Sequence, residues 1–143
     1  MKLRINIDKT KEEEIIVFAH ERTRLVDEIE RLVSDNAFDL IGYCEREAKA
    51  LLPSDIHCFT VEENKVYALT DNGKYFVKSR LYRLEEELSN NFVKINQSCL
   101  ANVRKIERFD ASVSGALTVR FKNGFVDYVS RRNLKKVKER FGL

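Results

Sequence analysis

The stretch KVYALTDNGKYFVK, from Lys65 to Lys78, predicts the fold of this 143-residue chain most directly. Two segments in which apolar and polar residues alternate, residues 65–70 and 75–78, flank the dipeptide Asn72-Gly73. Asn-Gly between alternating segments is a strong hairpin signal, because both central residues of the tight turn then take a positive φ. The stretch therefore predicts an antiparallel β-hairpin.

A second stretch of the same kind lies near the C-terminus, where residues 119–121 and 125–129 flank Asn123-Gly124. Two such pairs in one small chain favour antiparallel β structure. The fold class we expect is therefore mostly β, or α+β overall. Further strands are expected at residues 40–44, 48–52 and 56–61, with a turn at residues 62–64.

Apolar residues at helical spacing predict three helices among these strands. Before the first helix, alternation over residues 2–7 and an apolar run over residues 15–19 predict two more strands. Residues 1–36 are thus expected to form a small β-β-α element, followed by the main domain at residues 37–143. The helices and their expected N-caps are Leu25, Ile29, Leu32 and Val33 after Thr23, then Leu81, Leu84 and Leu88 after Ser79, and last Leu134, Val137 and Phe141 after Ser130.

Charge is spread unevenly along the chain. Residues 1–91 carry a net charge of −5, whereas residues 92–143 carry +8. A basic C-terminal part on an otherwise acidic chain indicates a polyanionic partner, and nucleic acid is the commonest. In the expected terminal helix, Arg132, Lys135 and Lys136 lie on the side opposite the apolar residues.

Signals for catalysis, metal binding or membrane insertion are missing from the sequence. No run of about 18 apolar residues occurs, and the N-terminus does not read as a secretory signal. Cys44, Cys58 and Cys99 have no metal-ligand spacing, so we expect buried, reduced thiols in a cytoplasmic protein. His20 and His57 lack a partner at such spacing, and no Gly-rich phosphate loop is present. We expect no enzyme activity, no metal and no cofactor.

Three ordered stretches carry a resemblance to a known family: FVKINQSCLAN at residues 92–102, VRKI at 103–106, and Asn123-Gly124 followed by VSRR at 129–132. Together they resemble the LytTR (LytR/AlgR-type) DNA-binding domain over about residues 38–143. The resemblance implies an elongated arrangement of small antiparallel sheets with short helices. Most members also carry a receiver domain, and this chain resembles the short bacterial members that lack one.

The resemblance also implies how DNA would be bound. Members of the family lie along duplex promoter DNA and insert loops at strand ends into successive grooves, usually on direct repeats. Lys94 and Asn96 stand where the family has arginine and histidine, so the recognised base sequence is expected to differ. The implied contact residues are Asn64 and Lys65 in the first loop, Lys94, Asn96, Gln97 and Ser98 in the second, and Arg131 and Arg132 in the third, with Lys135 and Lys136 near the DNA backbone.

These observations predict a sequence-specific, duplex DNA-binding transcriptional regulator, with residues 1–36 as an expected homodimerisation element. One alternative is a protein-interaction module whose basic helix docks an acidic partner. Another is a binder of RNA or single strands that stacks bases on aromatic side chains in strands, although a β core needs aromatics at the same positions. Those aromatics are Tyr67, Tyr75, Phe76, Phe92, Phe121, Phe125 and Tyr128.

Overall fold

The computed structural model describes residues 1–36 and 39–143. The boundary expected between residues 36 and 37 falls at residues 37 and 38, which lie outside the described residues. The elements are α1 (Arg24–Asp35), β1 (Ile41–Cys44), β2 (Glu47–Ala50), the 3-10 helix η1 (Pro53–Asp55), β3 (Ile56–Glu62), β4 (Lys65–Thr70), β5 (Gly73–Val77), α2 (Leu81–Glu87), β6 (Phe92–Asn96), β7 (Cys99–Asn102), the 3-10 helix η2 (Val103–Lys105), β8 (Ile106–Ala111), β9 (Leu117–Phe121), β10 (Val126–Val129) and α3 (Arg131–Phe141).

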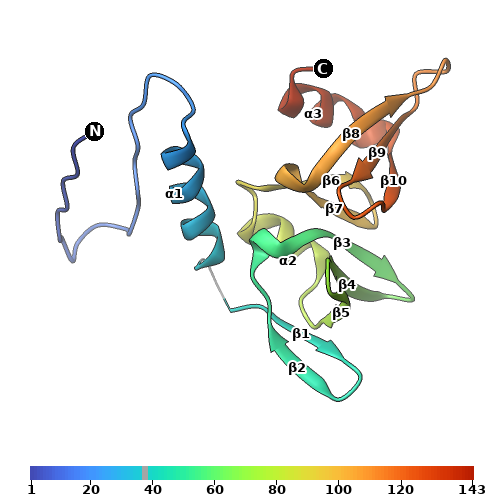
Figure 1. Cartoon of the computed structure of the whole chain (residues 1–143), viewed down its shortest axis with the longest axis horizontal. Coiled ribbons are helices and arrows are strands. Elements are labelled where there is room, and N and C mark those ends of the chain that lie inside the picture. Colours follow the sequence, from blue (N-terminus) through green and yellow to red (C-terminus); the bar gives the residue numbers. More distant parts are fainter. Residues whose placement is uncertain (37–38) are drawn as a thin grey trace.

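The strands of the described residues form two antiparallel sheets (Figure 1). The larger has seven strands in the order β2-β1-β5-β4-β3-β7-β6, and the smaller has three in the order β10-β9-β8. Most neighbours within each sheet follow one another in sequence and are joined by hairpins. The expected mostly β, antiparallel fold class is confirmed.

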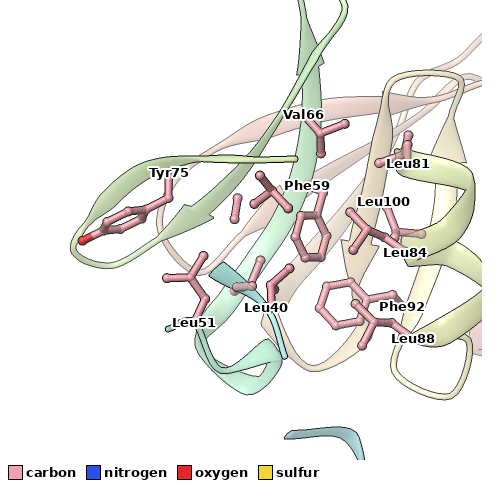
Figure 2. Packing of buried hydrophobic residues seen from close by; sticks show 13 residues of the cluster. Leu40, Leu51, Phe59, Val66, Tyr75, Leu81, Leu84, Leu88, Phe92 and Leu100 are labelled. Atoms are coloured by element: carbon pink, nitrogen blue, oxygen red, sulfur yellow. The ribbon is translucent and has the colours of Figure 1, made fainter. Parts of the chain in front are cut away.

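One face of the large sheet packs against α2 (Figure 2). Leu81, Leu84 and Leu88 are buried, as their helical spacing predicts, and point toward Phe59 and Phe92 from the sheet. The rings of Phe59 and Phe92 lie 5.4 Å apart at a tilt of 44°. These contacts form the first of two hydrophobic cores.

The second core lies between the other face of the large sheet, the small sheet and α3. Val137 of α3 is fully buried, and Leu134 and Phe141 pack against the same cluster. Phe141 meets Phe109 of β8 edge-on, with ring centroids 4.8 Å apart. The apolar spacing that predicted the terminal helix therefore also gives its buried face.

The tight turns differ from the Asn-Gly expectation. Gly73 and Gly124 have positive φ angles of 128° and 88°, but neither Asn72 nor Asn123 does. The turn with two consecutive positive φ values is Glu63-Asn64, at 50° and 63°, between the paired residues Glu62 and Lys65. Both predicted Asn-Gly hairpins exist, yet the backbone that needs left-handed φ at two central positions lies in a turn without glycine.

The prediction of two strands before the first helix is wrong. Residues 1–22 contain neither helix nor strand, although a turn at Asp8–Lys11 is closed by a hydrogen bond from Lys11 N to Asp8 O at 3.3 Å. Alternation gives each segment an apolar side, but a strand also needs a hydrogen-bonded neighbour. None of the described strands supplies one for residues 2–7 or 15–19.

The predicted helix starts are close to the observed ones. Thr23 caps α1, and its hydroxyl accepts a hydrogen bond from Val26 N at 3.4 Å. Arg80, rather than Ser79, is the N-cap of α2. Ser130 is the N-cap of α3, but its hydroxyl accepts from the side chain of Asn133 at 2.8 Å instead of from a helix N–H.

Candidate nucleic-acid interface

Three strand-end segments lie next to one another. They are the β3–β4 turn with Asn64 and Lys65, the end of β6 with its turn at residues 94–98, and the β10–α3 junction at residues 130–132; we name them together the strand-end row. The amide N–H of Val61 donates to the carbonyl of Ser98 at 2.9 Å, which joins the first segment to the second. Segments separated by about 30 residues in sequence are thus brought to one edge.

Asn96 joins the second segment to the third. Its Nδ2 donates to the carbonyl oxygen of Tyr128 at 2.9 Å, and its Oδ1 accepts from the amide of Ser98 at 2.8 Å. The amide of Ser130 donates to the carbonyl of Ile95 at 2.9 Å. Because Asn96 is only 2% exposed and uses both ends of its amide internally, it offers nothing to DNA. The expectation that Asn96 contacts DNA is therefore corrected: it positions the row.

A β-bulge at the end of β6 precedes this turn. Lys94 pairs with Leu100 and Asn96 with Cys99, so Ile95 is an extra residue on its strand. A bulge interrupts alternation and re-aims the side chains that follow it. Here the Asn96 side chain points toward the small sheet. Lys94, on the other side of the bulge, is half-exposed beside the turn.

Lys94, Gln97 and Arg132 line one surface hollow of about 350 Å³, together with Asn133. Gln97 and Arg132 are exposed. The sequence did not point to Asn133, although its place in the first turn of α3, directly after Arg132, is a signal that could have found it. The second and third expected loops thus meet in one concave surface.

The remaining expected residues do not line this hollow. Asn64, Lys65, Ser98, Arg131, Lys135 and Lys136 are all exposed. Lys135 shares a different hollow with Arg131 and Lys138, whereas Lys136 lies in a third one with Phe92 and Val93. The two lysines therefore leave α3 on different sides, which their adjacent positions in the sequence concealed.

Asn102 is a structural residue. It is 2% exposed, its Nδ2 donates to the carbonyl of Ile56 at 2.8 Å, and its Oδ1 accepts from the amide of Arg104 at 3.0 Å.

The cysteines divide into a buried pair and an exposed one. Cys58 and Cys99 are buried and reduced, as expected, but Cys44 is exposed at the end of β1, contrary to the expectation of burial. The hydrogen bond between the Cys99 and Cys58 side chains and the burial of the site raise the pKa of Cys99 well above its ordinary value of 9.0. A thiol in this state is a poor nucleophile.

His57 is a packing residue. It is 2% exposed, and its Nε2 lies 2.7 Å from Oδ1 of Asp71. In the described part of the chain, no group of three or more His, Cys, Asp or Glu side chains is placed to hold a metal ion. None of the helices described is long and apolar enough to cross a membrane.

The aromatic residues named for stacking differ in burial, and Tyr128 of β10 is 57% exposed. Tyr75, Phe92 and Phe121 are buried, which agrees with their expected role in the core. Tyr67 and Phe76 instead lie half-buried with their rings 6.0 Å apart, and Tyr43 follows at 6.3 Å from Phe76. Lysine side chains lie over this group: Lys74 is 4.5 Å from the Tyr67 ring centroid and Lys78 is 4.9 Å from that of Tyr43.

Fold and surface define a class of protein: an antiparallel β domain that gathers basic and amide side chains at its strand ends. The family model for the LytTr DNA-binding domain matches residues 46–142. The chain belongs to this family of DNA-binding domains.

Relatives and a solved structure agree with this assignment. A Staphylococcus aureus (strain MSSA476) protein named an uncharacterized HTH-type transcriptional regulator is 32% identical over 148 residues, covering 100% of this chain and 99% of its own. A relative with the same description from strain NCTC 8325 is 35% identical over 109 residues, covering 76% and 74%. The solved LytTr DNA-binding domain of a putative methyl-accepting/DNA response regulator from Bacillus cereus has a TM-score of 0.69 at 16% identity, covering 73% of this chain and 97% of its own.

The names of the relatives specify a helix-turn-helix type, and the helices of this chain are arranged differently. Among residues 1–36 and 39–143, strands separate α1 from α2 and α2 from α3. A helix-turn-helix needs two helices joined by a short turn. The described residues therefore contain no helix-turn-helix.

Proposed function

We propose that this chain is a transcriptional regulator that acts in the cytoplasm and binds duplex DNA in a sequence-specific manner through the strand-end row. One observation carries the proposal: hydrogen bonds from Val61 to Ser98, from Asn96 to Tyr128 and from Ser130 to Ile95 hold three separate segments together. The row exposes cationic and amide side chains, which are the groups that bind phosphates and base edges.

Base reading is assigned to Arg132 and Gln97. Arginine can bind O6 and N7 of guanine with two parallel hydrogen bonds, and glutamine can do the same with N6 and N7 of adenine. The two side chains line the same hollow, so they would read neighbouring parts of one groove. Arg131 lies in a different hollow and is assigned to the phosphate backbone.

Phosphate contacts are assigned to Lys94, Ser98 and Lys136. Lys94 and Ser98 lie in the β6–β7 segment, and Lys136 lies one turn of α3 beyond Arg132. Asn64 and Lys65, in the β3–β4 turn, would reach the next groove along the duplex. Contacts to phosphate fix the register of a protein on DNA without reading its sequence.

A second candidate function rests on the group of Tyr43, Phe76 and Tyr67. These rings lie on a sheet surface with lysine side chains over them. Aromatic rings beside cationic groups are typical of surfaces that bind single strands by stacking. Binding of single-stranded DNA or RNA through this group is the alternative to duplex recognition.

The experiment begins with selection of random duplexes on the full-length protein. Fluorescence anisotropy then compares the selected duplex, a scrambled duplex, a single strand and RNA at one salt concentration. We expect the selected duplex to bind about 10³-fold or more tightly than the scrambled one. Arg132→Ala should remove most of this preference, whereas Arg83→Ala, on the exposed side of α2, is the matched control and should retain it.

Other outcomes would contradict the proposal. Tightest binding to the single strand, lost in Tyr67→Ala, would favour the second candidate. Failure to bind any nucleic acid would favour the protein-interaction module.

A further inference from the structure

Helix α1 docks on the main domain through its polar side. Nη2 of Arg104 lies 2.5 Å from Oε2 of Glu30 and 3.5 Å from Oδ1 of Asp27. Asp35 accepts hydrogen bonds from the amide and hydroxyl of Ser54 at 3.0 and 2.9 Å. These polar contacts fix which side of α1 faces the sheets.

The apolar side of α1 faces solvent as a consequence. At 100° per residue, Leu25, Ile29, Leu32 and Val33 form a stripe roughly 100° wide. The docking residues Asp27 and Glu30 lie roughly 140° to 200° around the axis from Leu25. Leu25 is 51% exposed, and none of the twelve residues of α1 is buried. A helix normally turns this stripe toward a core, so α1 presents the reverse of the usual arrangement.

Residues 1–22 continue this exposed apolar surface. Leu3 is 86% exposed and Phe18 is 91% exposed. Figure 1 shows this segment on the opposite side of α1 from the two sheets. Exposed apolar groups of this extent mark interaction sites in soluble proteins. Large apolar side chains at least 40% exposed in this region are Met1, Leu3, Ile5, Ile7, Ile15, Ile16, Phe18, Leu25, Leu32 and Val33.

The charges of residues 1–22 are arranged for pairing between two segments of this kind. Residues 1–11 contain four Lys or Arg and one Asp, a net charge of +3. Residues 12–21 contain four Glu and no Lys or Arg, a net charge of −4. The basic part of one segment and the acidic part of another therefore attract each other. Both parts also carry exposed apolar side chains, which such a contact would cover.

The area available is that of a protein–protein interface. A Val, Leu, Ile, Phe or Met side chain removes roughly 60–120 Å² from water on full burial, so these ten partly exposed ones offer roughly 400–800 Å² per copy. A standard interface buries about 800 Å² per partner. Because the same residues are present on every copy, a twofold axis can bring them together in a self-complementary contact.

We propose that residues 1–22 and the apolar side of α1 form a homodimer interface, with a second copy of this chain as the occupant. The exposed apolar side chains of residues 1–22 and the stripe of Leu25, Ile29, Leu32 and Val33 pack against the same residues of the second copy. The interface lies apart from the strand-end row, so each copy keeps its own DNA-contacting surface free.

Sedimentation equilibrium of the full-length protein tests this proposal, with a reducing agent present because Cys44 is exposed. We expect twice the monomer mass at tens of micromolar. Leu25→Asp/Leu32→Asp and, separately, Ile5→Lys/Ile7→Lys should each weaken the dimer at least about tenfold. Val113→Asp changes a fully exposed apolar residue in the β8–β9 loop and is the matched control; it should remain dimeric.

Folding, dimerisation and DNA binding are measured separately. Circular dichroism shows whether each variant keeps its fold, and the variant in residues 5 and 7 changes no residue of a helix or strand. Monomeric wild-type protein, or variants that remain dimers, would overturn the proposal. Dimerisation is measured without DNA, so a dimer that binds no duplex would contradict the proposed function and leave this interface standing.

Discussion

The side-chain amide of Asn96 donates to the main-chain carbonyl of Tyr128 at 2.9 Å, which links β6 of the large sheet to β10 of the small one. Through this bond the two sheets hold the segments of the strand-end row in one orientation. Its removal leaves a buried carbonyl without its donor. Asn96→Ala should therefore lower the free energy of unfolding by about 1–3 kcal/mol and also weaken DNA binding.

The neighbouring residue supplies the matched control for that change. Gln97 is exposed, so Gln97→Ala should alter the free energy of unfolding by less than about 0.5 kcal/mol. It should nevertheless reduce affinity for the selected duplex. Urea denaturation of the two variants measures stability, and fluorescence anisotropy measures DNA binding. Equal losses of stability would contradict a structural role for Asn96 that Gln97 lacks.

Arg132 should contribute to sequence preference as well as to affinity. Arg132→Ala should cost about 1–3 kcal/mol on the selected duplex and much less on a scrambled one. Arg132→Lys should restore only part of this, because an ammonium group cannot form the two parallel bonds of a guanidinium. Arg131→Ala is the control and should weaken both duplexes alike. Equal losses on both duplexes for Arg132→Ala would make this residue a phosphate contact.

Salt dependence reports on the lysines of α3. For about 5–8 phosphate contacts, log K should fall with log salt concentration at a slope of about −5 to −7. Lys136→Ala should flatten the slope by about one, and Lys135→Ala/Lys136→Ala by about two. If the double variant flattens the salt slope by only about one, DNA contacts α3 only on the side that carries Arg132. An unchanged slope would show that these lysines of α3 face solvent and do not contact DNA.

Acid should remove a contribution of Asp71 to stability. The hydrogen bond from His57 and the charge interaction with it, aided by the charge of Lys105, hold the pKa of Asp71 below its ordinary value of 3.8. A carboxyl whose pKa is lowered by folding stabilises the native state above its unfolded pKa, and this contribution is lost as the pH falls through the folded pKa. Wild-type protein should thus be more stable than Asp71→Asn at pH 7, with the difference shrinking below about pH 4. Thermal melts against pH measure it, with the exposed Glu86→Gln as control.

Thiol labelling should distinguish the three cysteines. Cys44 is exposed, whereas Cys58 and Cys99 are buried and the pKa of Cys99 is raised by its bond to Cys58 and by burial. Native protein should therefore react quickly at one thiol, and denatured protein at three. In Cys44→Ser the fast phase should vanish. A second fast thiol in the wild type would show that the core beneath the strand-end row opens readily.

Local pattern was enough to predict most of the elements. Strands β3 and β4 follow from their apolar and alternating residues, and α3 follows from Leu134, Val137 and Phe141. In both cases the predicted apolar residues lie in a core, because alternation of two or a spacing of three to four residues gives one element one apolar side. The ordered motifs between Phe92 and Arg132 pointed to the LytTr family, which the family model confirms.

Pairing between distant segments was decided only by the tertiary structure. Alternation over residues 2–7 indicated a strand, but a strand exists only where a neighbour supplies hydrogen bonds, and no local pattern states whether one is present. In the candidate site, too, contact between distant segments decides which side chains are exposed. Asn96 and Gln97 are adjacent amides in the sequence, yet contact with Tyr128, 32 residues away, buries one and leaves the other exposed. The sequence determined which side chains stand at the strand ends, and the packing of two sheets determined which of them can reach a partner.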